Sequence, residues 1–577
     1  MGVKIVSKES WWKRGIFETL PDQILPALNH KQVLRALFCT ITLLVFFSCR
    51  EDSLTEAETE EELTYPPPEI WWNDQVFYEV FVRSFYDSNG DGIGDFNGLT
   101  QKLDYLNDGD PSTETDLGVT ALWLMPIHPS PSYHGYDVTD YRDVNPYYGT
   151  MTEFKHFLDE AHKRGIKVII DFVINHTSDQ HPWFVNSSSG TNAEKRSWYI
   201  WNSSNPGDNG PWGQTVWHQR NNAYFFGLFN GGMPDLNHRN KNVYSEIQDI
   251  VRFWHDDIGV DGFRVDVAGG LIEEGQAQVN TQSTLDWWRK FYSFQKNMDP
   301  AFMTVGEVWS STSVVSPFSD QRLDYCFEFD LSYAIVGAVR SGNSDGLIAK
   351  MEEVLGAYNE LQYGTFLTNH DQNRVIEEFE LNVDKAKLAA GILLSLPGVP
   401  YMYYGEEVAM RGVKPDESIR RPMQWTSGAQ AGFTTGSPWL PPQPNYTEFN
   451  VADLQQEPTS VWNHYRKLIK CRLNNLALKQ GNYERVGSNS SVIYTFLRIK
   501  DNDAVLAIHN ISGNLMTDIH FSIAESGLVP GTYNVTDMLN ETDLGTLTVG
   551  PLGSLTNFKP LAAIPALSSH LLKLEKQ

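Results

Sequence analysis

The chain has 577 residues, of which 41% are hydrophobic and 20% are charged, and its formal net charge is −27 at pH 7. This is the composition of a globular protein long enough for two or three domains. The negative charge argues against nucleic acid or an anionic membrane surface as a partner. Aromatic residues reach 12% and include 17 Trp, so flat apolar side chains are abundant.

The N-terminus, residues 1–48, has the order of a targeting segment. Lys31 and Arg35 precede the apolar run 36–47, and a small residue and Cys49 follow it. A basic region, a short apolar region and a small residue before the cleavage point are typical of a signal peptide. The apolar run is too short for an ordinary transmembrane helix. The segment resembles a bacterial lipoprotein signal with Cys49 as the lipidated first residue, and a plain cleaved signal peptide is the alternative.

Residues 49–70 are acidic, poor in apolar side chains, and end near three consecutive prolines. This composition predicts an extended tether. Acidic residues directly after the lipidated Cys resemble the surface-export signal of some bacterial lipoproteins. We therefore expect an exported protein, at the outer membrane or cell surface, that meets the membrane only through its lipid. Beyond Cys49 only Cys326 and Cys471 remain, so no disulfide framework is expected.

The stretch 86–99, "YDSNGDGIGDFNGL", follows the first predicted strand and alternates oxygen side chains with glycines. Ca²⁺ takes six to eight oxygen ligands, and alternating Asp and Asn on a Gly-bent loop can supply several of them. The start fits an EF-hand loop, but its twelfth position is Gly98 and not Glu. A solvated acidic turn is the alternative, because Asp, Asn and Gly all favour turns.

From about residue 75 to 405, apolar strands alternate with amphipathic helices. The predicted strands are, in order, QVFYEVFVRSF, VTALWLMPI, IKVIIDFVINH, VDGFRVDVA, FMTVGEV, DYCFEFD, TFLTNHD and GVPYMYYG. The first predicted helix carries Phe154, Phe157, Leu158 and Ala161 on one face and stops at Gly165. Eight buried strands with helices between them predict a (β/α)₈ TIM barrel, of the α/β class.

Two regions depart from this alternation. Residues 177–237 are rich in Trp, Asn, Ser and Gly, and we predict a small subdomain inserted after the third strand. Residues 471–577 contain short β runs separated by turns, which predicts a C-terminal antiparallel β-sandwich. The barrel would then comprise residues 71–176 and 238–470.

The predicted strands end in unusually polar residues. In a barrel these ends meet on one rim, where active sites lie. A charged side chain in a buried strand is expensive unless it is paired or functional. Singly, each could be a structural ion pair or a satisfied core histidine, but together they predict a functional site. The residues concerned are Asp171, Asn175, His176, Arg264, Asp266, Glu307, Asn369, His370 and Asp371.

At these positions the motifs DFVINH, GFRVD, GEVW and FLTNHD resemble those of the α-amylase family of glycoside hydrolases, in the family's order and rough spacing. MPDLN at 233–237 resembles a further family motif, and GYDVTDY, YYGEE and RRPMQW are additional matches. Together they span residues 71 to 425. MPDLN also resembles the subgroup intermediate between oligo-1,6-glucosidases and neopullulanases, which includes surface lipoprotein amylases.

The resemblance implies catalytic roles. Asp266 matches the nucleophile, Glu307 the general acid/base, and Asp371 the third carboxylate, which holds sugar hydroxyls. Arg264 lies two residues before Asp266, so both point to one face of a strand, and its charge is expected to keep Asp266 ionised. Retention requires two carboxyls about 5–5.5 Å apart, with the acid's pKa raised.

Further residues match substrate or metal ligands of the family. His176 and His370 match hydrogen-bonding partners of the sugar, and Tyr136 matches its stacking platform. In many members of the subgroup the loop after the first strand binds calcium, a structural ion. The matching ligands are the side chains of Asp87, Asn89, Asp91 and Asp95 and the carbonyl of Ile93. Asn175 matches a ligand of a second calcium site, which stays open.

The implied activity is that of a retaining, endo-acting α-amylase that hydrolyses α-1,4 bonds of starch and malto-oligosaccharides, with Ca²⁺ as cofactor. Where many α-amylases have Lys-His after the nucleophile segment, this chain has Gly269-Gly270, which leaves the acceptor side open. A neopullulanase, an α-glucosidase or a transglycosylase could use the same carboxylates. A non-catalytic glycan-binding protein is disfavoured, because Asp266, Glu307 and Asp371 are all present.

The expected partner is a starch-like α-glucan, with other surface glycan-binding proteins as further candidates. Five Trp residues are dense in the predicted insertion, and they could line a sugar groove or form the core of the subdomain. They are Trp183, Trp198, Trp201, Trp212 and Trp217.

Overall fold

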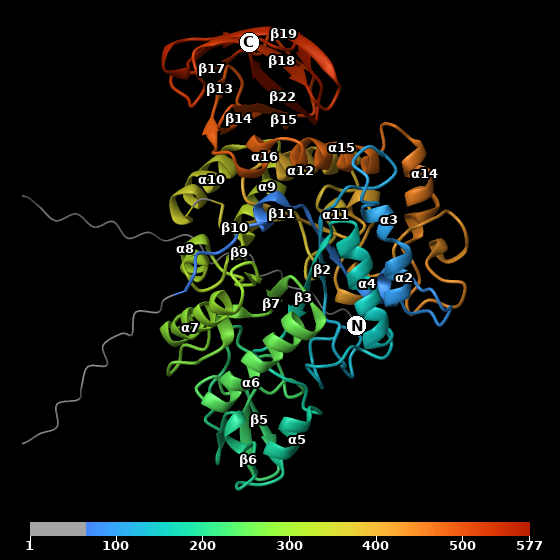
Figure 1. Cartoon of the computed structure of the whole chain (residues 1–577), viewed down its shortest axis with the longest axis vertical. Coiled ribbons are helices and arrows are strands. Elements are labelled where there is room, and N and C mark those ends of the chain that lie inside the picture. Colours follow the sequence, from blue (N-terminus) through green and yellow to red (C-terminus); the bar gives the residue numbers. More distant parts are fainter. Residues whose placement is uncertain (1–64, 360) are drawn as a thin grey trace, which may run out of the picture. The chain divides into compact units, whose positions relative to one another are not determined.

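The computed structural model describes residues 65–359 and 361–577 (Figure 1). The predicted signal peptide, Cys49 and most of the predicted tether lie outside these residues. Within the described part, no helix is both long enough and apolar enough to cross a membrane.

A closed barrel of parallel strands forms the centre of the described chain. Within these residues it has eight strands, in the order β1-β11-β10-β9-β8-β7-β3-β2. This confirms the predicted TIM barrel. The strands are β1 (Phe77–Val80), β2 (Ala121–Leu124), β3 (Lys167–Phe172), β7 (Gly262–Val265), β8 (Met303–Gly306), β9 (Tyr325–Phe327), β10 (Tyr363–Thr365) and β11 (Val399–Tyr403).

Some strands are shorter than predicted. β10 ends at Thr365, so Asn369, His370 and Asp371 lie in a loop beyond the strand. Thr365 is paired with Pro400 of β11, which has no N–H to extend the ladder. The polar residues that were expected at strand ends are therefore partly carried by the loops that follow the strands.

Amphipathic helices surround the barrel, and α4 shows how the sequence specifies one. Its N-terminus has a capping box between Thr150 and Glu153, and the predicted apolar face is buried. α6 continues into a wider turn, η3 (Phe253–Ile258), which ends at Gly259 with φ of 93°, a value that favours glycine. The longer helices are α4 (Met151–Lys163), α6 (Lys241–Arg252), α7 (Gln282–Met298), α9 (Phe329–Ser341), α10 (Asp345–Ala357), α12 (Val383–Ser395) and α15 (Val461–Leu473).

Shorter helices lie in the connections between these elements. They are α1 (Val82–Phe85), α2 (Phe96–Gln101), α3 (Leu103–Leu106), α5 (Pro182–Ser188), α8 (Thr312–Val315), α11 (Val375–Glu378), α13 (Asp416–Ile419), α14 (Val451–Gln456) and α16 (Leu476–Gln480).

Aromatic side chains fill the interior of the barrel. Phe77 and Tyr401 stack with their ring centroids 4.5 Å apart, and Trp123 and Phe327 pack beside them. Burial of such rings is a large part of the apolar stabilisation of the barrel. This aromatic cluster meets the polar rim at Trp123, whose Nε1 donates to Asp171 and whose ring lies beneath the guanidinium of Arg264.

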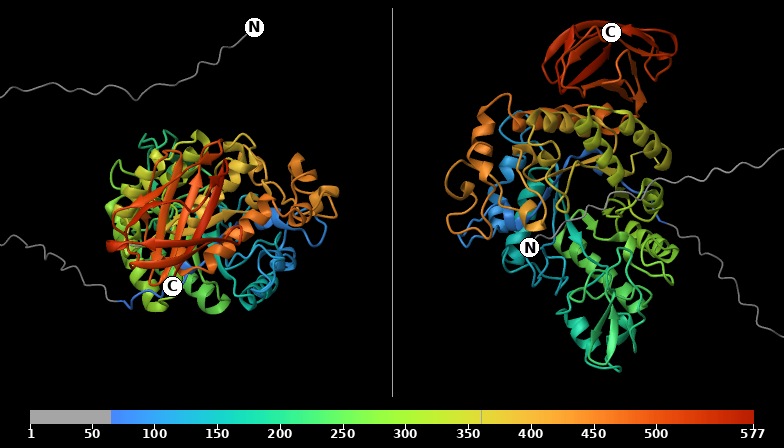
Figure 2. Two further views of the ribbon diagram at one scale, coloured as in Figure 1. Left: turned by 90° about the horizontal axis from the view of Figure 1, so that it is seen from above. Right: turned by 180° about the vertical axis from the view of Figure 1, so that it is seen from behind.

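The predicted insertion lies between β3 and α6 (Figure 2). It contains a small antiparallel sheet. Its strands are β4 (Trp201–Asn202), β5 (Trp217–Arg220) and β6 (Ala223–Phe226). Bridges between His176 and Asp235 and between Tyr199 and Leu236 join the two ends of the insertion. The insertion is therefore anchored directly beside the end of β3.

The C-terminal part is antiparallel, which confirms the predicted class. Within residues 484–576 a six-stranded sheet, β12-β14-β15-β22-β18-β19, shares a core with the sheet β13-β17-β20. The strands are β12 (Glu484–Arg485), β13 (Gly487–Ser488), β14 (Ile493–Lys500), β15 (Asp503–Asn510), β16 (Met516–Thr517), β17 (Phe521–Ile523), β18 (Gly531–Asp537), β19 (Thr542–Val549), β20 (Leu555–Phe558), β21 (Ala563–Ile564) and β22 (Ser568–Lys576).

Two buried arginines bind backbone carbonyls around the end of α12. Arg498 of β14 donates to the carbonyl of Ser395, the last residue of α12, and to those of Gly481 and Asn482 after α16. Arg472 of α15 donates to the carbonyls of Leu394, Leu396 and Gly398. The bond from Arg498 to Ser395 joins the C-terminal sheet to α12, and the bonds of Arg472 satisfy carbonyls at the end of α12 and in the loop before β11.

The acidic loop after β1 is closed by its own hydrogen bonds. Asp87 accepts from the backbone N–H groups of Asn89, Gly90 and Gly92. Asp95 caps α2 and also accepts from Ser88. These turns fold the loop tightly.

Candidate active site

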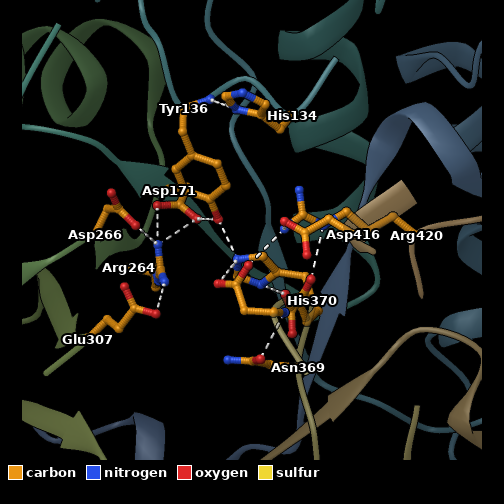
Figure 3. A network of polar contacts seen from close by, with 12 residues as sticks. His134, Tyr136, Asp171, Arg264, Asp266, Glu307, Asn369, His370, Asp416 and Arg420 are labelled. Atoms are coloured by element: carbon orange, nitrogen blue, oxygen red, sulfur yellow. Dashed lines mark hydrogen bonds and ion pairs between the residues drawn. The ribbon is translucent and has the colours of Figure 1, made fainter. Parts of the chain in front are cut away.

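Arg264 is the centre of a buried charge network on the barrel rim (Figure 3). Its Nη1 lies 2.7 Å from Oδ1 of Asp266 and 2.9 Å from Oδ1 of Asp171. Its Nη2 lies 2.8 Å from Oε1 of Glu307. One guanidinium thus holds carboxyls that come from the ends of β3, β7 and β8, strands that are neighbours in the barrel. The predicted convergence of these residues is present.

The strand geometry explains this convergence. Phe263 and Val265 of β7 alternate with Arg264, so Arg264 and Asp266 share the inner face. Glu307 directly follows β8, and its backbone N–H donates to the carbonyl of Val265. Asp266 and Glu307 therefore meet at the same height on adjacent strands.

Burial sets the proton affinities of these carboxyls. It raises the pKa of Glu307 to about 7, although Arg264 acts in the opposite direction. It also raises the pKa of Asp266 to about 6, against the lowering effect of Arg264. We expected Arg264 to keep Asp266 ionised at neutral pH, and it lowers the pKa, but desolvation is the larger effect. The two values still lie in the order that an ionised Asp266 and a protonated Glu307 require.

A second network is formed around His370. Its Nε2 lies 3.0 Å from Oδ2 of Asp371 and 2.6 Å from the hydroxyl of Tyr136, whose ring is stacked on the imidazole. Arg420 donates through Nη2 to Oδ1 of Asp371 at 2.7 Å. The Tyr136 hydroxyl donates to Asp171 at 3.1 Å, which links this network to that of Arg264.

His176 lies at the same rim in a different electrostatic setting. It is buried, and its ring nitrogens face Oδ1 of Asn175 at 3.0 Å and the carbonyl of Tyr136 at 3.2 Å. Burial lowers its pKa to about 4, so the imidazole is neutral at neutral pH. His176 therefore faces two uncharged acceptors, whereas His370 lies beside the carboxyl of Asp371.

These residues line a cavity of about 650 Å³. Tyr136, His176, Asp266, Glu307 and Asp371 all contribute to its wall. Carboxyls and aromatic rings in one cleft suit a ligand with hydroxyl groups and apolar faces, which is the chemistry of a sugar.

One side of the cavity is markedly apolar. Its wall includes Val267, Val279 and Val308, with Trp212 of the insertion and Trp309. Trp212 is 64% exposed and Trp309 is 51% exposed, which is unusual for rings of this size. The Trp309 ring is stacked on Phe329 with centroids 4.7 Å apart, and its Nε1 donates to Tyr333. Trp309 is thus a fixed flat surface beside Glu307.

The other tryptophans of the insertion mostly belong to its core. Trp198 is buried, Trp183 packs against it, and Trp201 is stacked on Phe184. Trp212, stacked on Phe229, is the member of the group that lines the cavity. Of the two roles that the sequence left open for these tryptophans, core of the subdomain applies to most of them and lining of the cavity applies to Trp212.

Gly269 and Gly270 form part of the cavity wall where a Lys-His pair was the family pattern. A Cβ on Gly269 would lie 2.2 Å from Oδ1 of Asn280, and one on Gly270 would lie 3.0 Å from a methyl of Val267. No side chain fits at residue 269 unless Asn280 moves.

The predicted calcium ligands lie on the loop after β1. Asp87 and Asp95 are buried and accept from the loop's own N–H groups, whereas Asn89 and Asp91 are exposed. Among the described residues, no three His, Cys, Asp or Glu side chains gather in a group that could hold a metal ion. The carboxylate, amide and carbonyl oxygens of the loop suit calcium in kind. Asn175 uses its Nδ2 to donate to the carbonyl of Gly270.

The structure adds residues to which the sequence analysis gave no role at the site. Asp171 was one of the polar strand-end residues and had no assigned chemical role, and it binds Arg264. Arg420 lies in the quoted RRPMQW motif and holds Asp371. Glu79 contacts His370 from β1. A single acidic residue inside the apolar run FYEVF was the signal for Glu79.

Comparison with known proteins agrees with this fold. Residues 79–481 match the family model described as alpha amylase, catalytic domain. Alpha-amylase 3 of Dictyoglomus thermophilum is 40% identical over 450 residues, which cover 77% of this chain and 86% of that protein. The oligo-1,6-glucosidase of Parageobacillus thermoglucosidasius is 32% identical over 523 residues, with coverage of 77% and 91%.

A solved structure is similar over most of the chain. The crystal structure of an alpha-amylase from H. orenii superposes with a TM-score of 0.76 at 38% identity, covering 87% of this chain and 99% of that one. Fold, site and comparisons together define a glycoside hydrolase. The chain belongs to the α-amylase family.

We predict that Asp171→Asn moves the acid limb of kcat/KM for glycoside hydrolysis to lower pH. The charge of Asp171 raises the pKa of Asp266, so its removal lets Arg264 stabilise the ionised Asp266 carboxyl at lower pH. The acid limb of kcat/KM reports a group of the free enzyme that must be ionised. The measurement is a pH–rate profile of both proteins on a chromogenic malto-oligoside.

Asp179→Asn is the matched control for this prediction, because Asp179 pairs with Arg220 at 3.5 Å and not with Arg264. Its acid limb should stay in place. An unchanged or upward-shifted limb in Asp171→Asn would contradict the electrostatic account of the site.

Proposed function

We propose that this protein is a retaining, endo-acting α-amylase that hydrolyses α-1,4-glucosidic bonds of starch-like glucans. The observation that carries the proposal is the attachment of Asp266 and Glu307 to the two terminal nitrogens of the buried Arg264, at the wall of a sugar-sized cavity. Two carboxyls on one guanidinium stand close together, which suits the short spacing of a retaining pair. Burial raises the pKa of Glu307 to about 7, which makes it available as an acid near neutral pH, and Arg264 counters the effect of burial on the pKa of Asp266.

The reaction proceeds as a double displacement. A carboxylate oxygen of Asp266 attacks the anomeric carbon while Glu307 gives its proton to the departing glycosidic oxygen, which leaves as an alcohol. Glu307, now ionised, then takes a proton from a water molecule whose oxygen attacks the same carbon. The bond to Asp266 breaks and the starting protonation states return.

The surrounding residues position the sugar. Asp371 is held by Arg420 and His370, which together keep the pKa of its carboxyl far below the ordinary value despite burial, so it accepts hydrogen bonds from hydroxyl groups. Tyr136 offers its ring face to the sugar. His176 offers a neutral imidazole.

The α-1,4 and endo assignments are supported by the relative named alpha-amylase and by exposed Trp212 and Trp309, which extend the apolar wall beyond the carboxyls. The alternatives are a neopullulanase, an α-glucosidase or a transglycosylase with the same carboxylates. Cleavage of α-1,6 bonds is also an alternative, because some relatives are named oligo-1,6-glucosidase.

Product analysis distinguishes these functions. On amylose the enzyme should release mixed malto-oligosaccharides early, because an endo-acting enzyme cuts inside the chain. Pullulan should be cut slowly or not at all. Glucose as the sole early product, efficient pullulan cleavage, or products longer than a maltotriose substrate would favour the α-glucosidase, the neopullulanase or the transglycosylase respectively.

Asp266→Asn and Glu307→Gln should each lower kcat on amylose by at least about a thousandfold, since each removes a bond-forming or proton-transfer role. Thermal melts should show that both variants fold. Asp249→Asn and Glu352→Gln, on exposed helix faces, make the same chemical changes and should keep wild-type activity. Either active-site variant retaining more than a few per cent of kcat would refute the assigned role.

We also propose that the protein is exported and anchored by lipid at Cys49. The support is the basic, apolar and small-residue order that precedes Cys49. In a bacterial expression host the wild type should fractionate with membranes, and Cys49→Ala should be found in the soluble exported fraction. Cys39→Ala is the control and should stay with the membranes. A wild type found in the soluble exported fraction would indicate a plain signal peptide, and unchanged membrane association of Cys49→Ala would indicate another attachment.

Calcium is proposed as a structural ligand of the loop at 87–95. The support is its donor set, which comprises carboxylates, an amide oxygen and the Ile93 carbonyl on one Gly-rich segment. A ligand that binds only the folded state stabilises it by about 2.7 kcal/mol at a hundred times its Kd. A chelator should therefore lower the Tm by several degrees.

The variant to compare is Asn89→Ala with Asp91→Ala, because both side chains are exposed and neither caps α2. Its Tm should no longer respond to calcium. Asp108→Ala with Asp110→Ala removes charge from another acidic loop and should respond as the wild type does. Equal responses in all three proteins would place calcium elsewhere, and no response in the wild type would identify 87–95 as a solvated turn.

A further inference from the structure

Glu79 is an acidic residue inside the barrel. It is the third residue of β1, and its register partners are Trp123 of β2 and Tyr403 of β11. It points to the same side of β1 as Phe77, a member of the aromatic cluster. Only 2% of its surface is exposed. A carboxyl in such surroundings is costly unless a partner offsets the loss of water.

That partner is His370. Oε1 of Glu79 lies 2.5 Å from Nδ1 of His370, which is fully buried. On the other side of the ring, Nε2 lies 3.0 Å from Oδ2 of Asp371. The imidazole therefore stands between two carboxyls, one behind it in the barrel and one at the cavity. Its edge also meets the Trp123 ring.

The charge state of His370 depends on these two neighbours. Burial alone would lower its pKa, but Asp371 and Glu79 together raise the pKa to about 10. The other titratable or charged groups that face His370, Glu79 or Asp371 include His134, Tyr136, Asp171, Arg264, Asp266, Glu307, Tyr403, Glu406 and Arg420. The arginines favour a neutral His370 ring and the carboxylates favour a charged ring. Removal of one carboxylate therefore lowers the pKa of His370.

We propose that Glu79 is a positioning residue that keeps His370 doubly protonated and directs its Nε2–H toward the Tyr136 hydroxyl and the adjacent Asp371 carboxyl, which both line the cavity. The expected effect on hydrolysis rests on the proposed function, whereas the protonation state of His370 does not. With Nδ1–H donated to Glu79, the ring orientation is set and the second proton is placed at Nε2. Without the charge of Glu79, the buried imidazole would lose one proton, and the remaining proton could lie on either ring nitrogen. Asp371 would then lose a cationic neighbour.

The first experiment reads the protonation state directly. In protein with ¹⁵N-labelled histidine, both ring nitrogens of His370 should remain protonated from pH 6 to pH 9, with His370→Asn used to assign the signals. In Glu79→Gln, which keeps the size but not the charge, His370 should titrate within this range. A wild-type His370 that titrates near neutral pH overturns the proposal, whatever the activity of the enzyme and whether or not the variant folds.

The second experiment follows the consequence for hydrolysis. We compare kcat/KM of Glu79→Gln with that of the wild type as a ratio, which removes the pH dependence that is common to both proteins. This ratio should fall about tenfold between pH 6 and pH 8.5, because His370 loses its proton in the variant alone. Glu79→Asp, which restores the charge, should flatten the dependence on pH. A ratio for Glu79→Gln that does not change with pH overturns the proposal.

The third experiment separates positioning from general support of the barrel. In the His370→Asn background, Glu79→Gln should cause no further pH-dependent loss, since it acts through His370. Glu407→Gln is the matched control: Glu407 is another buried barrel carboxyl, held by Tyr78 and Tyr105. Its ratio to the wild type should stay flat with pH. An equal loss from Glu79→Gln in both backgrounds would show a structural role and overturn the proposal.

Discussion

The rim of this barrel depends on one buried guanidinium. Arg264 is 1% exposed, and the carboxyls of Asp171, Asp266 and Glu307 are bound to it in a nearly dry environment. Burying so many acidic groups without a shared cation would protonate them or unfold the rim. Because the bonds of Arg264 reach three strand ends, the same interaction that offsets desolvation also sets the relative heights of these carboxyls. Chemistry and stability are thus difficult to change separately here.

The rim is better described as two linked charge systems than as a set of independent residues. One surrounds Arg264 and the other surrounds His370, and Tyr136 and Asp171 connect them. The first leaves its carboxyls with raised pKa values, and the second leaves Asp371 strongly ionised. Acidic groups a short distance apart therefore have very different proton affinities, which is how one fold can hold a nucleophile, an acid and a permanent anion together.

Much of this was accessible from the sequence because the signals are local. The polar ends of apolar strands located Asp266 and Glu307, and the composition change located the insertion. The partners that tune these residues were not accessible in the same way. Glu79 and His370 are 291 positions apart, and only closure of the barrel, which pairs β1 with β11, brings them together. Likewise the sequence could not say which Trp of the insertion faces the cavity, since Trp198 and Trp212 occupy similar stretches and differ only in tertiary contact.

The close contact between Gly269 and Asn280 has a consequence for how this pocket can evolve. A side chain at residue 269 would meet the amide oxygen of Asn280, which lies on a different segment, so a substitution at 269 requires the Asn280 side chain to turn away. The shape of the acceptor side is therefore set by two positions together. Variation of Gly269 and Asn280 in combination would sample more side chains on this wall than variation of Gly269 alone.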